Sequence, residues 1–184
     1  MSRAAAAEAA AEEDGETVRS AKFVVVVGNP RPASRTHTVA VEAARLVAKH
    51  AAIDAEPEII DLTSLAPLLL AAEPSSAVEA AVGQVRDADV LLVASPTYKG
   101  TYTGLLKVFF DRIPAGDLAG TVALPLLVMG SPRHALAVEV HLRPLLVELG
   151  ATVPTPGLAL LEADLEAPGA VLTDWAERVA PALR

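Results

Sequence analysis

A segment near the start of the sequence concentrates side chains that bind anions. Residues 28–37 read GNPRPASRTH, which places Arg31, Ser34, Arg35 and Thr36 directly before a stretch with helical periodicity. The first amides of a helix and the positive end of its dipole attract phosphate, and hydroxyl and guanidinium donors add charge-assisted hydrogen bonds. The segment therefore predicts a pocket for a terminal phosphate monoester. An exposed loop with helix caps and solvated arginines is the alternative interpretation.

This segment lacks the glycines of a dinucleotide-binding loop. No glycine occurs between Gly28 and Gly83, whereas the Rossmann fingerprint needs three so that the backbone can approach a pyrophosphate. The lysine of a Walker loop is missing as well. No G-x-S-x-G pattern marks the nucleophile of a serine hydrolase. These absences favour a phosphate site lined by side chains.

A second segment carries groups suited to a flat ligand. Residues 95–104 read SPTYKGTYTG and contain both tyrosines of the chain together with Gly100 and Gly104. Tyrosine offers a flat apolar surface with a polar tip, and glycine lets the backbone approach a planar ligand closely. A phosphate loop beside this segment predicts a phosphorylated planar ring system, and FMN fits that description. A turn that only packs its tyrosines on the surface is the alternative.

Alternating apolar segments indicate which elements position these two loops. Short β-branched runs predict strands, and longer stretches with apolar residues three and four apart predict helices. The predicted strands cover residues 22–27, 58–62, 90–94, 121–129 and, more weakly, 152–160. The predicted helices cover residues 34–50, 76–86, 104–112, 134–149 and 168–183, with a kink at Pro144.

The strand–helix alternation predicts an α/β fold. Buried strands joined by helical crossovers form a parallel sheet with helices on both faces. We expect a three-layer sandwich around a five-stranded parallel sheet of order 2-1-3-4-5. Ligands bind such sheets beyond the carboxyl ends of the strands where the winding reverses, here between strands one and three. Residues 28–37 and 95–104 follow those two strands, so they should form one site.

Composition narrows the class of protein and its partners. The 184 residues are enough for one domain over 21–184, and residues 1–20, which lack an apolar face, are predicted to be a disordered tail. No apolar run reaches the roughly 18 residues of a membrane-spanning helix, and no secretory signal is present, so we expect a cytoplasmic location. The net charge of −8 without a basic cluster argues against nucleic acid and anionic membranes as partners.

Metal and thiol chemistry are not expected, whereas self-association is. The chain has no cysteine, and His134 and His141 lie two helical turns apart, too far to chelate one ion without other ligands. The segments 105–113 and 134–149 are apolar on more than one face. Helices of this kind pack against a second subunit, which predicts a homodimer or homotetramer.

The two loops together resemble a known family. The motifs GNPRPASRT and SPTYKGTYTGLLKVFFDR, with about sixty residues between them, are similar to those of the NADPH-dependent FMN reductases, and so is the later stretch GSPRHALAVEVHLRP at 130–144. That last stretch resembles the alkanesulfonate-utilisation branch. The resemblance implies a flavodoxin-like fold, FMN as ligand and NADPH as reductant, with NADH as an alternative.

The resemblance also implies roles for individual residues. The FMN phosphate would be surrounded by Asn29, Arg31, Ser34, Arg35 and Thr36, with His37 beside them. The isoalloxazine ring would be lined by Pro96, Thr97, Tyr98, Lys99, Gly100 and Thr101, with Tyr102 close by. Its other edge would be approached by Gly130 and Ser131. No catalytic side chain is implied, because the cofactors carry the hydride chemistry.

The resemblance implies hydride transfer from NADPH to FMN, with the reduced flavin supplied to a monooxygenase or another acceptor. Three alternatives are a quinone, azo-dye or metal reductase that retains FMN, an electron carrier of the flavodoxin kind, and a binding or scaffold protein with a degenerate site. Some family members that release reduced flavin carry an inserted aromatic residue that locally widens the helix corresponding to residues 134–149. Here that position reads Val140-His141, which leaves open whether FMN is released or retained.

Overall fold

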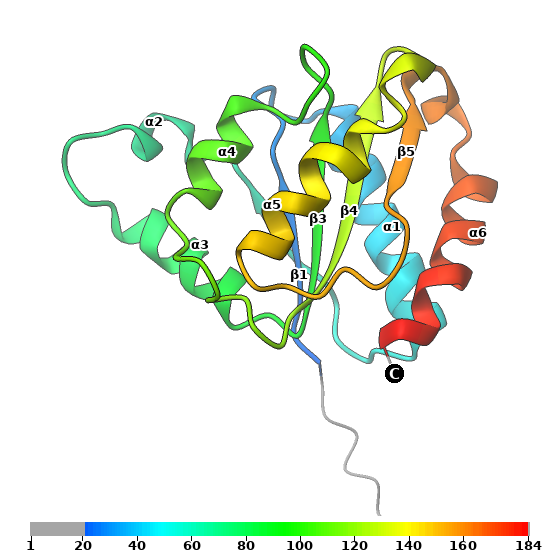
Figure 1. Cartoon of the computed structure of the whole chain (residues 1–184), viewed down its shortest axis with the longest axis horizontal. Helices are drawn as coiled ribbons and strands as arrows, with labels where there is room; N and C mark the ends of the chain where they lie inside the picture. Colours follow the sequence, from blue (N-terminus) through cyan, green and yellow to red (C-terminus); the bar gives the residue numbers. More distant parts are fainter. Residues whose placement is uncertain (1–20, 184) are drawn as a thin grey trace, which may run out of the picture.

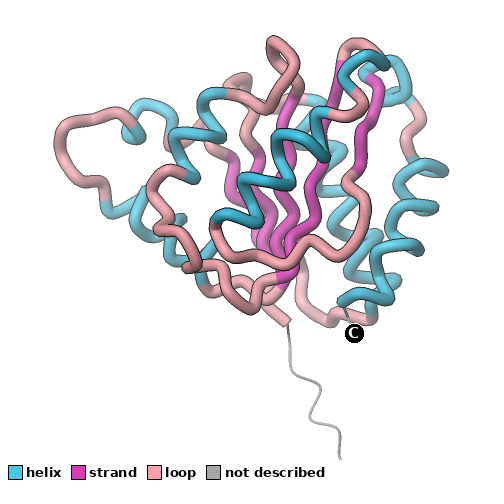
Figure 2. The backbone as a smooth tube through the Cα atoms, viewed as in Figure 1, coloured by secondary structure: helices cyan, strands magenta, loops and turns pink. Residues whose placement is uncertain are grey.

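A parallel sheet lies at the centre of the molecule. The computed structural model describes residues 21–183, so the tail predicted over 1–20 lies outside the described residues. The strands run in the order β2-β1-β3-β4-β5, which confirms the predicted topology (Figures 1 and 2). Their bounds are β1 Phe23–Val27, β2 Glu58–Asp61, β3 Val90–Pro96, β4 Val122–Met129 and β5 Leu158–Leu161.

Helices cover both faces of this sheet, which gives three layers (Figure 1). One face is covered by α1 (Arg35–Ala51) and α6 (Gly169–Val179), and the other by α3 (Ser76–Arg86), α4 (Gly104–Phe110) and α5 (Arg143–Glu148). The remaining helical turns are α2 (Ala66–Leu69), η1 (Pro132–His134), η2 (Val138–Leu142), η3 (Glu162–Glu166) and η4 (Ala180–Leu183). The short turn α2, with Pro67 in its first turn, was not predicted.

The strands divide their side chains between two cores. In β1, Val24 and Val26 pack toward α3 and α4, whereas Phe23, Val25 and Val27 pack toward α1 and α6. All five residues are buried, because helices cover both faces of the strand. A side chain buried in this way contributes about 1.5–3 kcal/mol relative to an exposed one. This two-sided burial explains why the strand reads as an uninterrupted apolar run.

The last strand is shorter than predicted. The prediction placed it at 152–160, but the ladder covers only Leu158–Leu161, and Thr152 makes a single isolated bridge to Val122. Between them, Pro154 and Pro156 have no amide hydrogen to donate to a neighbouring strand. The segment 153–157 is therefore a loop and not part of the strand, and this loop contacts a helix.

The segment predicted as one helix over 134–149 is divided into three. The 3₁₀ turn η1 leads to the π-helical turn η2, which continues directly as α5. Pro144 has no amide hydrogen for the carbonyl of Val140, and the amide of Arg143 donates to the carbonyl of Val138, five residues earlier. The kink predicted at Pro144 is thus a π-helical widening. It forms although positions 140 and 141 are valine and histidine, without the inserted aromatic residue that the resemblance associates with a widened helix.

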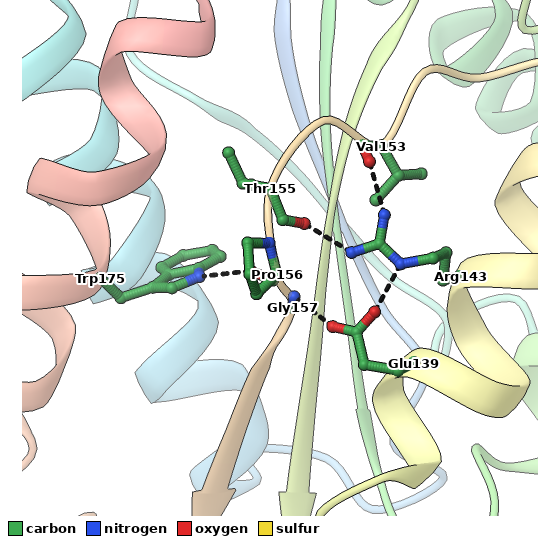
Figure 3. Close-up of polar contacts among 7 residues, drawn as sticks. All are labelled: Glu139, Arg143, Val153, Thr155, Pro156, Gly157 and Trp175. Carbon is green, nitrogen blue, oxygen red and sulfur yellow. Dashed lines mark hydrogen bonds and ion pairs between the residues drawn. The ribbon is translucent and has the colours of Figure 1, made fainter.

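Side chains of η2 and α5 hold the loop before β5 (Figure 3). The carboxylate of Glu139 accepts the amide hydrogen of Gly157 at 2.7 Å and pairs with the guanidinium of Arg143. That guanidinium also donates to the carbonyls of Val153 and Thr155, the latter at 2.6 Å. This cluster, the Glu139–Arg143 clamp, ties the widened helix to the edge of the sheet.

We expect Arg143→Lys to lower the free energy of unfolding by about 2 kcal/mol, because an ammonium group cannot reproduce the hydrogen bonds of a planar guanidinium. For a chain of this size the melting temperature should fall by about 4–8 °C. The control is Asp111→Asn, which disrupts the exposed pair between Lys107 and Asp111 and should cost less than about 0.5 kcal/mol. Equal losses for the two variants would contradict a structural role of the clamp.

The clamp should also weaken in acid. The hydrogen bond from Arg143 holds the pKa of Glu139 below its ordinary value of 4.5, and the Gly157 amide acts in the same direction. A lowered pKa means that the ionised carboxylate stabilises the fold above pH 4.5 and that this contribution disappears as the pH falls through the lowered pKa. Glu139→Gln should therefore melt below the parent at pH 7, and the difference between their melting temperatures should narrow in acid.

Candidate functional site

Loops that follow the carboxyl ends of four strands enclose a cavity of about 470 Å³. It lies where the sheet order reverses between β1 and β3, as predicted for this topology. Nine of the residues predicted for the site line it: Asn29, Arg31, Ser34, Arg35, Thr36, Pro96, Thr97, Tyr98 and Gly130. The other lining residues, which were not predicted, are Pro32, Ala33, Val128, Glu162 and Leu165.

The loop after β1 is held by its own polar side chains. Asn29 is buried, donates from Nδ2 to Thr36 Oγ1 at 3.1 Å and accepts the amide hydrogen of Arg31 at 3.0 Å. Ser34 is the N-cap of α1, and its hydroxyl accepts the amide hydrogen of His37 at 3.1 Å. The amides of Arg35 and Thr36 precede the helical hydrogen-bond ladder and so remain donors for an anion. The local geometry is that of an anion-binding turn.

The loop after β3 is a tight turn. The amide of Tyr98 donates to the carbonyl of Thr101 at 2.8 Å, and the amide of Thr101 donates back at 3.3 Å. Between them, Lys99 (φ 54°) and Gly100 (φ 84°) both occupy the left-handed region. That pattern defines a hairpin turn in which glycine is favoured at the second position. The turn presents Tyr98, which is 41% exposed, at the mouth of the cavity.

Thr103 joins the two loops, and the sequence analysis missed it. Its hydroxyl donates to the carbonyl of Gly28 and accepts the amide hydrogen of Leu106 at 3.1 Å, which makes it the N-cap of α4. Its amide donates to the hydroxyl of Ser95 at 3.0 Å. Thr103 and Ser95 are fully buried, so these bonds fix the loop after β3 against the end of β1. The local signal was a threonine before the glycine that starts a helix.

Six predicted residues lie outside the cavity lining. They are His37, Lys99, Gly100, Thr101, Tyr102 and Ser131. Ser131 instead caps η1, with its hydroxyl accepting the amide hydrogen of Arg133 at 3.4 Å. Tyr102 lines a separate cavity between α4 and α5, together with Phe110 and His141.

A larger hollow of about 590 Å³ lies elsewhere, and its lining includes His37. All of its lining residues belong to the outer face of α1, so it is an open groove along one helix. A groove on one helix cannot surround a ligand from several sides, and the smaller cavity at the strand ends is therefore the candidate site.

Within residues 21–183, no group of acidic or histidine side chains could hold a metal ion. In the same range, no helix has the length and apolarity needed to cross a membrane.

Two features of the cavity show what it can bind. Arg31 and Arg35 bring positive charge beside the hydroxyls of Ser34 and Thr36, which suits a phosphate group. The hydroxyl oxygen of Thr97 is buried in the lining without a hydrogen-bond partner, so it is available to a polar atom of a ligand. Together with the surface of Tyr98, these groups fit a phosphorylated aromatic molecule such as FMN.

Glu162 introduces a negative charge that the sequence analysis did not predict. It is the first residue of η3, directly after β5, and its carboxylate pairs with the guanidinium of Arg35. The sequence analysis ended the last strand at residue 160 and gave no role to the residues that follow. Placing the carboxyl end of that strand at the same edge as the other loops would have brought Glu162 into consideration.

Comparisons with known proteins identify the family of this chain. A family described as NADPH-dependent FMN reductase matches residues 21–165. The FMN reductase (NADPH) of Escherichia coli is 38% identical over 132 residues, which covers 71% of this chain and 68% of that protein. The NADH-dependent FMN reductase SfnF of Pseudomonas fluorescens is 35% identical over 150 residues, which is 79% of each chain.

The fold agrees with a solved structure as well. The apo form of the NADH:FMN oxidoreductase EMOB superposes with a TM-score of 0.74 at 29% identity and covers 89% of this chain and 90% of that one. The family match covers more than half of the chain, and the relatives exceed 30% identity over most of their length. The resemblance seen in the two loop motifs is therefore confirmed. This chain belongs to the NADPH-dependent FMN reductase family.

Proposed function

We propose that this chain transfers hydride from NADPH to FMN and releases the reduced flavin to a monooxygenase or another acceptor. One observation carries the proposal: the arginine and hydroxyl loop after β1 and the tyrosine loop after β3 line the same cavity. Its two ends match the phosphate and the aromatic ring of a flavin mononucleotide. NADH is an alternative reductant, since relatives with either preference are similar to this chain.

The residues of this chain would bind and orient the flavin. Arg31, Ser34 and the first amides of α1 would hold the phosphate, and the free hydroxyl of Thr97 would meet a polar atom farther along the ligand. The bound flavin supplies the two-electron chemistry by accepting hydride from the nicotinamide, which leaves oxidised NADP⁺. The amide of Thr101 already donates to the carbonyl of Tyr98 within its turn, so it is not free to donate to a flavin.

The charge around the cavity favours an enzyme over an electron carrier. Carriers of the flavodoxin kind use an acidic surface to meet their partners, whereas Arg31 and Lys99 are exposed cations beside this cavity. An anionic nucleotide such as NADPH is attracted by such cations. This arrangement supports pyridine nucleotide as the reductant.

The test is steady-state oxidation of NADPH by the purified protein, with FMN, with riboflavin or with no added flavin. Oxidation that requires FMN and saturates with it is the expected result, with riboflavin less effective because it lacks the phosphate. Protein that purifies yellow and oxidises NADPH only with an added quinone or azo dye would instead establish the flavin-retaining alternative. Absence of both flavin binding and oxidation would contradict the proposal.

We also propose that the protein acts in the cytoplasm as a homodimer or homotetramer. Three apolar side chains in this region are exposed. Leu136, in the turn before η2, is 70% exposed, Val140 on η2 is 56% exposed, and Val147 on α5 is 54% exposed. Exposed apolar groups on neighbouring turns are typical of a subunit interface. Light scattering should therefore give a multiple of 19.0 kDa, and Val140→Glu should shift the protein toward the monomer. A parent protein that stays monomeric at micromolar concentration would contradict this.

A further inference from the structure

Glu162 reaches across the candidate flavin site to a residue far away in the sequence. It follows β5 at the start of η3, and its partner Arg35 lies 127 positions earlier, in the first turn of α1. The same carboxylate faces the end of β4, since a Cβ added to Gly130 would lie 3.8 Å from Glu162 Oε2. All three residues line the cavity. The carboxylate therefore lies inside the proposed site.

The ion pair between Arg35 and Glu162 contributes little to the stability of the fold. The side chains of Arg35 and Glu162 are 64% and 52% exposed, and ion pairs that water can reach contribute little to stability. We expect the pair to affect the binding of a phosphate ligand more than the stability of the fold. A phosphate monoester carries nearly two negative charges at neutral pH, and it would need the guanidinium that Glu162 occupies. It would also be repelled by the carboxylate beside it.

We propose that Glu162 determines how tightly the site holds flavin: its carboxylate competes with the FMN phosphate for Arg35 and so keeps FMN exchangeable. This inference rests on the proposed function, and it deepens it, because an enzyme that releases reduced flavin must let the flavin leave. Arg31, for which no side-chain ion pair is present within residues 21–183, then serves as the constant phosphate contact.

The test compares two ligands in three proteins. Binding of FMN and of riboflavin, which lacks the phosphate, is measured by quenching of flavin fluorescence in the parent, in Glu162→Gln and in Glu166→Gln. Glutamine has the shape of glutamate without its charge. Glu166 is a matched control, because it lies on the same short turn, is exposed and does not line the cavity. Melting temperatures show whether each variant is folded.

Glu162→Gln should bind FMN about tenfold more tightly than the parent, since one nearby negative charge is removed from the phosphate site. Stopped-flow measurement should show a correspondingly slower release of FMN. Glu162→Gln should bind riboflavin as tightly as the parent does. Glu166→Gln should bind both FMN and riboflavin as tightly as the parent does. Unchanged or weaker FMN binding by folded Glu162→Gln would overturn the inference, and so would an equal gain for riboflavin. Failure of the parent itself to bind FMN would overturn the proposed function, and this inference with it.

Discussion

Replacement of Arg31 by alanine is expected to weaken FMN binding by about 10–100-fold, because a charge-assisted hydrogen bond to phosphate contributes about 1.5–3 kcal/mol. Arg31 lines the cavity, and the amide hydrogen bond to Asn29 fixes its backbone in the loop after β1. Arg35 also carries a guanidinium group, but that group is already paired with the carboxylate of Glu162. Loss of Arg35 should therefore weaken FMN binding less than loss of Arg31.

The measurement is a flavin fluorescence titration with FMN and with riboflavin. Riboflavin binding should change less than about threefold, because it has no phosphate for Arg31 to contact. Arg45→Ala is the control, since Arg45 is exposed on the outer face of α1 and, within residues 21–183, forms its ion pair with Glu56 at 3.6 Å. Equal losses for FMN and riboflavin in Arg31→Ala would show that the phosphate does not bind at this loop.

Replacement of Gly157 by alanine is expected to destabilise the fold by about 3 kcal/mol, because overpacking of a tight contact displaces its neighbours. A Cβ at this position would lie 2.5 Å from Val138 Cγ2 and 3.0 Å from both Pro125 Cγ and the Pro125 carbonyl oxygen. The rigid Pro125 is part of β4, so little can move aside. Displacement would also disturb the bond from the Gly157 amide to Glu139.

Thermal unfolding followed by circular dichroism tests this expectation, and the melting temperature should fall by about 6–12 °C. Gly83→Ala is the matched control. Gly83 lies inside α3, and a Cβ there would meet nothing within 4 Å, so alanine should stabilise the protein by up to about 1 kcal/mol. If the two variants melt alike, η2 does not approach β5 as closely as the structure shows.

Local patterns in the sequence determined the order of the elements and most of the site. The run Phe23–Val27 is apolar at every position because both faces of its strand are buried, and its short, uninterrupted β-branched composition indicates that. The loops at 28–37 and 95–104 follow directly from their neighbouring strands and helices. Parallel order and right-handed crossovers then bring them to one edge of the sheet. Eight of the nine predicted lining residues lie in these two loops, whereas Gly130, which follows β4, was named through the family resemblance alone.

Contacts between distant segments were decided only by the tertiary structure. Glu162 meets Arg35 across 127 positions, and Thr103 meets Gly28 across 75, and no local pattern identifies the distant partner in either pair. The loop before β5 is likewise set by the guanidinium of Arg143 on a different element. Sequence patterns report which backbone a segment prefers and which face it buries. Which side chains meet at the ends of the strands depends on how the whole sheet brings those ends together.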